Sequence, residues 1–191
     1  MKGPVVILSG PSGVGKDTVL LAWQERNPLV VRVVACTTRA PRQGEKDGVD
    51  YRFCTEAEFQ RMAEEGRFLE YKNVHGNWYA TPLDQLEMLR QAGKIAVLKI
   101  DVQGALTAME LLPEAISIFL LPPSNEVLEA RLRSRKSDDE ATIQKRLRNA
   151  LEEMALAPRY HHRIVNDDLA ATVDQIEAAV GGASSPPSSS A

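Results

Sequence analysis

The chain is poor in the residues that mark several large classes of protein. Its 191 residues include two cysteines, three histidines and 5% aromatic residues. Cys36 and Cys54 lack the spacing of a metal site, so we expect reduced thiols and a cytoplasmic protein. Basic residues are also few, since 23 Lys and Arg stand against 26 Asp and Glu and the net charge is −3. We therefore expect no nucleic acid and no anionic membrane as a partner, because both need a basic surface.

Long apolar runs are missing as well. The run PVVILSG near the N-terminus is too short for a signal sequence and far too short to span a bilayer, so neither export nor membrane anchoring is expected. Low-complexity sequence is confined to residues 183–191, which we predict to be a disordered tail because they cannot bury enough apolar surface. The remaining chain is rich enough in apolar residues, at 43% overall, to form a core of ordinary size.

Short apolar, β-branched runs alternate with helical patterns along most of the chain. The runs that we predict to be strands are residues 5–8, 29–35, 95–101, 115–121 and 163–166. Strands that alternate with helices form a parallel sheet with helices on both faces. The predicted fold class is therefore α/β, a three-layer sandwich with a parallel sheet core.

Two stretches interrupt this alternation. Residues 38–85 carry most of the aromatic residues in short alternating runs around one helical pattern, which predicts a small mixed α+β insertion. Residues 124–157 have two helical patterns joined by a charged turn. The predicted core then consists of residues 1–37, 86–123 and 158–182.

The segment GPSGVGKDT lies between a predicted strand and a predicted helix. Glycines in this place let backbone N–H groups surround an anion, the helix N-terminus attracts it, and a lysine supplies a mobile positive charge. A glycine-rich turn with a chance lysine is the alternative. The context favours a P-loop that binds ATP through Gly10, Pro11, Ser12, Gly13, Val14, Gly15, Lys16, Asp17 and Thr18.

Asp17 stands where the usual pattern of this loop has Ser or Thr, whose hydroxyl lies beside Mg²⁺. Two interpretations stay open. The carboxylate either contacts the metal, directly or through water, or begins the helix, where negative charge is favourable for the helix dipole. Thr18 is the neighbouring hydroxyl and a second candidate Mg²⁺ ligand.

A second group of basic residues lies in the segment TTRAPRQGEKDGVDY. Arg39 and Arg42 are three residues apart, and two guanidinium groups on one short loop can bind a single phosphate. Tyr51 and Tyr79 can donate phenolic hydroxyls to the same group. The alternative is a solvated basic loop.

A third group comprises Arg131, Arg135 and Arg146 in the predicted pair of helices. Arginines on a helical hairpin can close over phosphates as a lid, and surface salt bridges are the alternative. The three groups together predict phosphoryl transfer from a nucleoside triphosphate to an acceptor that already carries phosphate. Such a reaction needs alignment and cations rather than a general base.

Eight ordered motifs between residues 3 and 180 resemble the guanylate kinases, which transfer the γ-phosphoryl group of ATP to GMP. They are GPSGVGK, TTRAPRQGEKDGVDY, FLEY, GNWYAT, IDVQGA, LLPPS, the lid pattern RLRSR…KRL, and IVNDD. The resemblance implies Mg²⁺ as cofactor, and ATP, GMP and dGMP as substrates of a monomer or homo-oligomer. It also implies that residues 38–85 are a GMP-binding region and that residues 124–157 are the lid.

The resemblance implies roles for individual residues. Those expected to bind GMP are Arg39, Arg42, Tyr51, Glu70, Tyr79, Thr81 and Asp101. Those expected to act on the ATP side or in catalysis, beyond the P-loop with Lys16, are Arg39, Arg131, Arg135, Arg146 and Asn166. Asp101 would also lie near the metal. Glu70 would accept from guanine N1–H and the 2-amino group, so AMP would leave it unpaired.

Three positions depart from the family pattern. Ala35 replaces a Ser or Thr that contacts guanine in many members, and Ala80 replaces a glycine. Lys99 replaces a frequent acidic residue two positions before Asp101. Lys99 can pair with Asp101 or with phosphate, or face outward on its strand.

The sequence leaves two other functions as alternatives. A guanylate-kinase-like binding module would have lost the ATP loop, and the intact Lys16 together with Arg39 and Arg42 argues against it. The segment GKDT also resembles ribose bisphosphate phosphokinases, which share the core but lack a guanine-binding insertion like the one around Glu70.

Overall fold

The computed structural model describes residues 2–74, 76–134 and 139–183. Its centre is a five-stranded parallel sheet in the order β2-β7-β1-β8-β9. The strands are β1 (Val5–Ser9), β2 (Val30–Arg32), β7 (Ile95–Lys99), β8 (Ile116–Leu121) and β9 (His162–Val165). The middle strand β1 is buried at all five positions, as expected of a parallel strand covered by helices on both faces.

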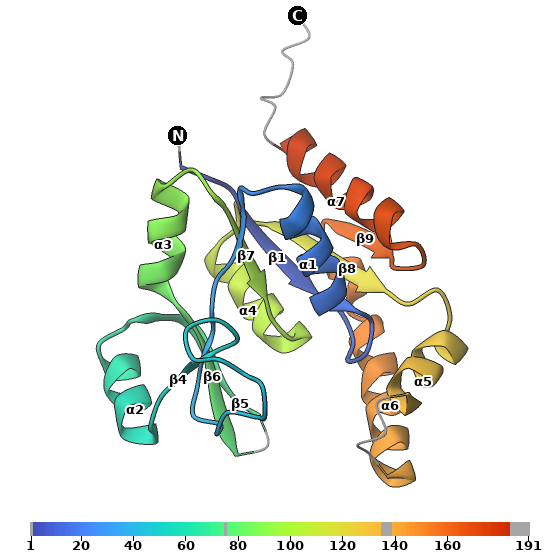
Figure 1. Cartoon of the computed structure of the whole chain (residues 1–191), viewed down its shortest axis with the longest axis horizontal. Helices are drawn as coiled ribbons and strands as arrows, with labels where there is room; N and C mark the ends of the chain where they lie inside the picture. The colour runs from blue at the N-terminus through green and yellow to red at the C-terminus, as the bar shows by residue number, and fades with distance from the viewer. Residues whose placement is uncertain (1, 75, 135–138, 184–191) are drawn as a thin grey trace, which may run out of the picture.

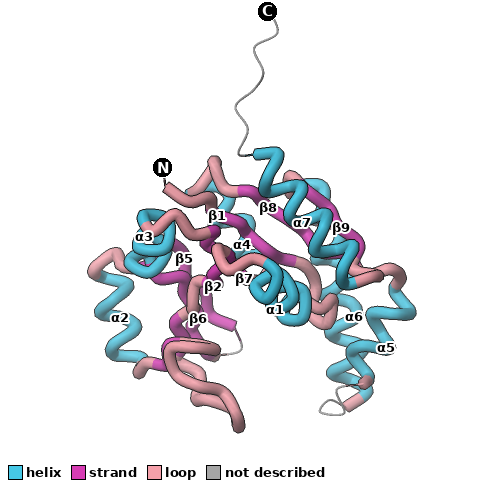
Figure 2. Tube along the Cα trace, turned by 45° about the horizontal axis from the view of Figure 1, so that its top comes forward, coloured by secondary structure: helices cyan, strands magenta, loops and turns pink. Residues whose placement is uncertain are grey.

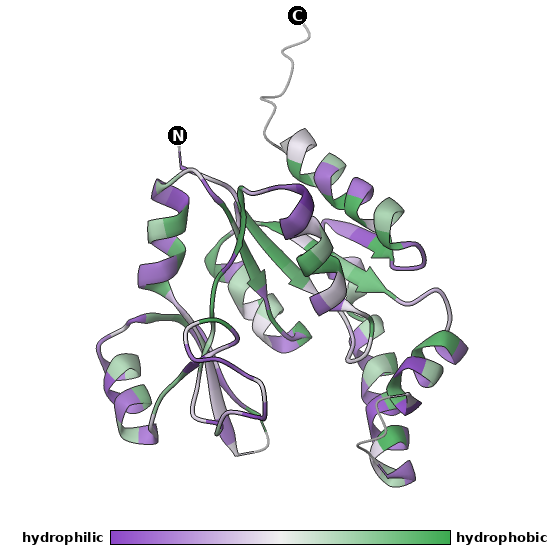
Figure 3. Ribbon diagram, in the orientation of Figure 1, coloured by the Kyte–Doolittle hydropathy of each residue, from purple (hydrophilic) through white to green (hydrophobic). Residues whose placement is uncertain are grey.

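Helices cover both faces of this sheet (Figure 1), which confirms the predicted α/β sandwich. They are α1 (Lys16–Arg26), α3 (Leu83–Gln91), α4 (Val102–Leu111) and α7 (Leu169–Ala183). Val6 and Leu8 of β1 belong to the core shared with α1 and α7, whereas Val5 and Ile7 belong to the core shared with α3 and α4. Alternate residues of one strand thus supply two cores. Figure 3 shows the hydrophobic central strands beside helices that carry both kinds of residue.

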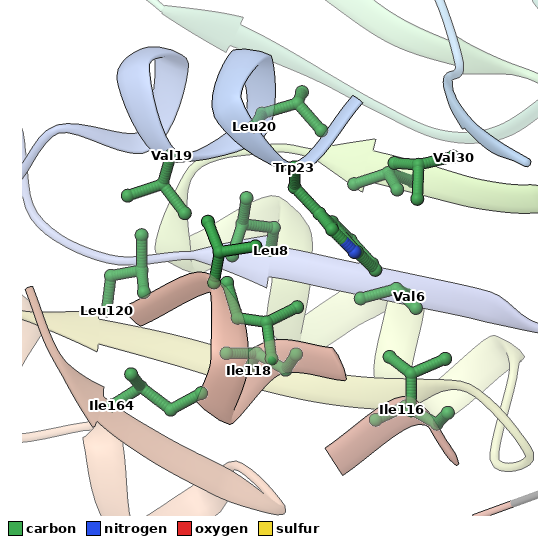
Figure 4. Packing of buried hydrophobic residues seen from close by; sticks show 14 of the residues in the cluster. Val6, Leu8, Val19, Leu20, Trp23, Val30, Ile116, Ile118, Leu120 and Ile164 are labelled. Carbon is green, nitrogen blue, oxygen red and sulfur yellow. The ribbon is translucent and has the colours of Figure 1, made fainter. Parts of the chain in front are cut away.

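Trp23 occupies the core between α1 and the sheet (Figure 4), where its side chain is fully buried. We expect Trp23→Ala to lower the free energy of unfolding by about 3–5 kcal/mol, because it removes apolar contacts and leaves a cavity. Urea denaturation followed by circular dichroism measures the change. Leu21→Ala in the same helix is the control, since Leu21 is 59% exposed and should change stability by only about 0.5 kcal/mol. Equal losses in the two variants would contradict this view of the core.

A second, four-stranded sheet has the order β4-β3-β6-β5. Its strands are β3 (Cys36–Thr37), β4 (Arg52–Phe53), β5 (Phe68–Val74) and β6 (Asn77–Pro82). The helix α2 (Glu56–Glu64) begins at a capping box formed by Thr55 and Glu58. Phe59 of α2 stacks on Trp78 of β6 with ring centres 5.8 Å apart. This sheet and helix therefore have a small aromatic core of their own.

The helical pair follows β8. Its elements are α5 (Asn125–Arg133), α6 (Glu140–Met154) and a short 3-10 helix, Ala157–Arg159. Leu128 and Leu132 of α5 pack against Ala150 of α6. Figures 1 and 2 show this pair and the second sheet on opposite sides of one end of the parallel sheet.

Two predicted strands are shorter in the structure. The run at residues 29–35 forms only β2, because the chain then leaves the first sheet to supply β3 to the second. The run at residues 95–101 ends at Lys99, because Asp101 instead caps α4 and accepts the N–H of Gly104 at 2.8 Å.

The C-terminal helix α7 extends to Ala183, and residues 184–191 of the predicted tail lie outside the described residues. Within the described part of the chain, no helix has both the length and the apolar character needed to cross a membrane.

Candidate active site

The loop between β1 and α1 turns through three glycines with positive φ, Gly10, Gly13 and Gly15. Gly15 has φ 102° and caps α1. A Cβ at Gly13 would lie 2.8 Å from Leu132 Cδ2 of α5, so a side chain there would meet the helical pair. Both the backbone conformation and this close approach require glycine. The loop leads directly into a helix N-terminus, which is the arrangement of an anion site.

Lys16, the first residue of α1, lies back over this loop. Its Nζ donates to the carbonyl oxygen of Gly10 at 2.5 Å and to that of Pro11 at 3.0 Å. Burial lowers the pKa of Lys16 to about 8, and the nearby carboxylate of Glu153 on α6 opposes this shift. A phosphate in the loop would therefore lie beside a partly desolvated ammonium group, where attraction is stronger than in water.

Arg131 and Asn166 both donate hydrogen bonds to the backbone of this loop. Asn166 is 7% exposed, and its Nδ2 donates to the Val14 carbonyl oxygen at 2.8 Å. Its Oδ1 accepts from Thr172 Oγ1 at 3.2 Å. Arg131 donates to the same Val14 oxygen at 3.1 Å and to the Asn166 carbonyl oxygen at 3.2 Å. The structure thus places both residues against the loop backbone.

Of the other two arginines predicted for the lid, the structure describes Arg146 but not Arg135. Arg146 lies half-buried on α6. Arg135 lies outside the described residues, so the prediction of its role rests on the sequence alone.

A cavity of about 500 Å³, which we call the acceptor pocket, is lined by both sheets and by the start of α1. All seven residues predicted to bind GMP line it: Arg39, Arg42, Tyr51, Glu70, Tyr79, Thr81 and Asp101. Sequence reasoning missed Arg32, Glu45 and Lys72, which also line it. An acidic residue three positions after Arg42 in a basic loop was a usable signal for Glu45, whereas nothing in the local sequence indicated the other two.

Arg39 is fixed at the pocket by two kinds of contact. Its Nη2 donates to both carboxylate oxygens of Glu45, at 2.8 and 3.0 Å. Glu45 also accepts the backbone N–H of Arg42 at 2.7 Å, so one carboxylate organises both arginines. The Arg39 guanidinium lies 5.3 Å from the ring centre of Tyr51, and the Tyr51 and Tyr79 rings meet edge to face at 5.9 Å. The result is a rigid cluster of donors suited to a phosphate.

Glu70 and Thr81 face one another across β5 and β6. The hydroxyl of Thr81, which is 2% exposed, donates to Glu70 Oε1 at 2.6 Å. Burial raises the pKa of Glu70, and the hydrogen bond from Thr81 opposes this shift. The hydrogen bond fixes the carboxylate in the pocket, where it can accept from a ligand that offers N–H groups.

Two of the three departures from the family pattern are small residues. Ala35 lines the acceptor pocket without offering a hydroxyl. Ala80 is buried and packs in the aromatic core with Phe59 and Phe68. Ala80 also lines the acceptor pocket, so the extra methyl group at this position borders both the aromatic core and the pocket.

Lys99, the third departure, forms an ion pair with Asp17. The Lys99 side chain is 12% exposed, whereas the Asp17 side chain is 78% exposed. Burial and the charge of Arg32 lower the pKa of Lys99, and Asp17 opposes this shift. The structure does not show the alternatives of pairing with Asp101 or facing outward: Lys99 binds the unusual P-loop carboxylate instead, and Asp101 has Lys72 Nζ at 3.5 Å. Contact of Lys99 with a phosphate stays a prediction.

The predicted Mg²⁺ ligands, Asp17, Thr18 and Asp101, are hard oxygen donors. Among the described residues, no group of three or more His, Cys, Asp or Glu is arranged to hold a metal. Asp17 and Asp101 both line the acceptor pocket. Two carboxylates without a protein cage fit Mg²⁺ that is held largely by substrate phosphates, as is usual in kinases. The donor set therefore fits a metal that arrives with the nucleotide.

The class of protein is defined by a P-loop at the end of a central parallel strand and by the pocket that it faces, with clustered arginines, tyrosines and a half-buried carboxylate. It is that of the P-loop kinases that phosphorylate a nucleoside monophosphate. The comparisons with known proteins name the family within this class.

A family model described as guanylate kinase matches residues 2–182. A guanylate kinase from Gloeobacter violaceus is 48% identical over 173 residues, covering 91% of this chain and 84% of that protein. One from Alcanivorax borkumensis is 44% identical over 179 residues, covering 94% and 86%. The chain belongs to the guanylate kinase family, whose members are ATP:GMP phosphotransferases.

Solved structures are similar as well. The crystal structure of guanylate kinase from Anaplasma phagocytophilum aligns with a TM-score of 0.79 at 35% identity, covering 97% of this chain and 88% of that one. A shikimate kinase from Bacteroides thetaiotaomicron aligns with a TM-score of 0.50 at 15% identity, covering 93% and 98%. The second likeness concerns the fold alone.

Proposed function

We propose that this chain transfers the γ-phosphoryl group of ATP to GMP or dGMP, using the acceptor pocket for the monophosphate and the P-loop for ATP. The observation that carries the proposal concerns one cavity. It is lined both by hydrogen-bond donors for a phosphate group, clustered around Arg39, and by the Glu70 carboxylate, which can accept hydrogen bonds from a base. Family membership supports the same reaction.

On the acceptor side, Arg39, Arg42, Tyr51 and Tyr79 bind the phosphate of GMP. Glu70 accepts from guanine N1–H and the 2-amino group. AMP lacks both of these donors and would leave the half-buried carboxylate with the Thr81 hydroxyl but no donor from the base, which costs several kcal/mol, or roughly 10²-fold in rate. None of these contacts involves the ribose 2′-hydroxyl, so GMP and dGMP are both accepted.

On the donor side, Lys16 and the loop N–H groups bind the β- and γ-phosphates of ATP. Arg135 and Arg146 of the lid contact the same phosphates. The contacts of Arg131 and Asn166 with the loop backbone support a positioning role, in which they fix Val14 and hence the loop beside the adenine site. The positive charges and alignment lower the barrier without a protein nucleophile.

Mg²⁺ accompanies ATP and neutralises charge on its phosphates, and Asp17, Thr18 and Asp101 are the residues that would hold it. The two cysteines are free thiols in the structure. Free thiols and nucleotide substrates support a cytoplasmic location.

We assign the core to residues 1–37, 86–123 and 158–182. Residues 38–85 bind GMP and residues 124–157 form the lid. The close approach of Leu132 to Gly13 of the P-loop supports a lid that lies beside ATP. Closure of both parts around the substrates would exclude water, which could otherwise accept the phosphoryl group.

An acceptor panel tests the proposed function. Purified protein is supplied with ATP, Mg²⁺ and either GMP, dGMP, AMP or UMP, and ADP release is measured. We expect ADP with GMP and dGMP, and rates at least about 10²-fold lower with AMP and UMP. Equal rates with all four acceptors would exclude the assignment to guanine nucleotides. Binding of nucleotides without any turnover would instead favour a binding module.

Glu45→Gln should raise KM for GMP about tenfold with little change in kcat. The variant keeps one acceptor oxygen but loses the charge that holds Arg39, worth about 1.5 kcal/mol for a charge-assisted hydrogen bond. Steady-state kinetics over a range of GMP concentrations separates the two constants. Glu65→Gln, at an exposed position of the same region, is the control. A fall in kcat with unchanged KM would show that Glu45 acts in another way.

A further inference from the structure

The ion pair between Asp17 and Lys99 joins two unusual residues. Asp17 occupies the P-loop position where a hydroxyl is usual, one residue after the phosphate-binding Lys16. Lys99 ends β7, a strand 82 residues further along the chain. The pair lines the acceptor pocket, so it lies at the border between the two proposed phosphate sites.

A carboxylate in this place carries a cost, because both substrates bring phosphate groups of the same sign. The ammonium of Lys99 cancels that charge on contact. Its own position is well suited to this, since the side chain is only 12% exposed and is held by the sheet rather than by a loop. Arg32 and Asp50 also line the pocket; the charge of Arg32 lowers the pKa of Lys99, and the charge of Asp50 raises it. Asp17 is the residue that forms an ion pair with Lys99 at this border.

We propose that Lys99 is a positioning residue that holds and neutralises the Asp17 carboxylate, so that a P-loop with a carboxylate in place of a hydroxyl still accepts nucleotide phosphates. The inference rests on the proposed function, in which ATP binds at this loop. Asp17 and Lys99 then offset one another: Asp17 alone weakens the binding of nucleotide phosphates, Lys99 alone strengthens it, and replacing both together restores a neutral site.

The test is a cycle of four proteins: the unmodified chain, Lys99→Met, Asp17→Ser and the double variant. ATP affinity is measured by calorimetry in the presence of EDTA, so that metal binding plays no part. Lys99→Met leaves an unpaired carboxylate and should weaken ATP binding about fivefold. Asp17→Ser leaves an unpaired ammonium and should tighten binding by a similar factor. The double variant should bind ATP within about twofold of the unmodified chain.

A second measurement separates this positioning role from a merely structural one. Lys99→Arg keeps the charge and should retain the unmodified affinity, whereas Lys99→Met should not. Lys2→Met is the control, because it removes an exposed ion pair with Glu87 and neither residue lines the acceptor pocket. It should change neither ATP affinity nor its response to EDTA. Thermal unfolding confirms that each variant is folded.

The inference is overturned if Lys99→Met binds ATP as well as the unmodified chain does in EDTA. It is also overturned if the double variant binds no better than Lys99→Met, because the Asp17 carboxylate would then not be the cause of the weaker binding that follows the loss of Lys99. Failure of the unmodified chain to bind ATP at all would contradict the proposed function instead.

Discussion

Lys16→Met is expected to lower kcat/KM for phosphoryl transfer by about 10³-fold or more. In the proposed mechanism the ammonium group stabilises the negative charge of the transferred phosphoryl group, and removing one charge of this kind from a transition state typically costs that much. Methionine nearly matches the length of lysine, and the loss of the two hydrogen bonds to Gly10 and Pro11 is offset because a charge is no longer buried.

ADP production from ATP and GMP measures the loss, and thermal unfolding checks the fold. Burial already lowers the pKa of Lys16 to about 8, which shows that the folded chain penalises its charge. We therefore expect no loss of stability in Lys16→Met. Lys46→Met, at an exposed position, should behave as the unmodified chain. Activity that survives the loss of Lys16 would rule out the proposed mechanism.

Glu70→Gln should lower kcat/KM for GMP by about 10²-fold or more and leave the low activity with AMP unchanged. The glutamine oxygen can still accept from Thr81, but the amide nitrogen would place a donor against the donors of guanine. The ratio of kcat/KM for GMP and AMP is the quantity to measure. Glu64→Gln on the exposed side of α2 is the control.

An equal loss of kcat/KM with GMP and AMP would show that Glu70 supports the structure and does not recognise the base. The pH dependence offers a second check. A protonated Glu70 donates instead of accepting, so selectivity for GMP should fall as the pH drops through the pKa of this group. Because burial raises that pKa, the fall should begin at a higher pH than for an ordinary glutamate. Glu70→Gln should abolish this dependence.

Much of the fold could be predicted from local sequence. The run that forms β1 predicts a buried strand, because an apolar, β-branched run in an α/β chain has few other structures open to it. Strand ends were less well predicted, because they depend on partners elsewhere. The chain after β2 changes sheets, and Asp101 ends the run after Lys99 by capping α4. Neither event has a signal within the strand itself.

Residue types and their order determined the candidate site in outline. Glycines with a lysine between a strand and a helix indicate a phosphate loop by backbone chemistry alone. The motifs around Arg39 and Glu70 indicated the acceptor. The structure brings these predicted residues into one cavity with Asp101, 62 positions after Arg39 in the numbering of the chain.

Asp17 shows the limit of sequence most clearly. By itself, the sequence determined that a carboxylate replaces a hydroxyl in the P-loop and that a lysine replaces an acid on a later strand. Only the tertiary structure decided that the two are partners. The physical reason is that β1 and β7 are adjacent in the parallel sheet, so the helix that follows one and the end of the other meet at the same edge, and charges distant in sequence neutralise one another there.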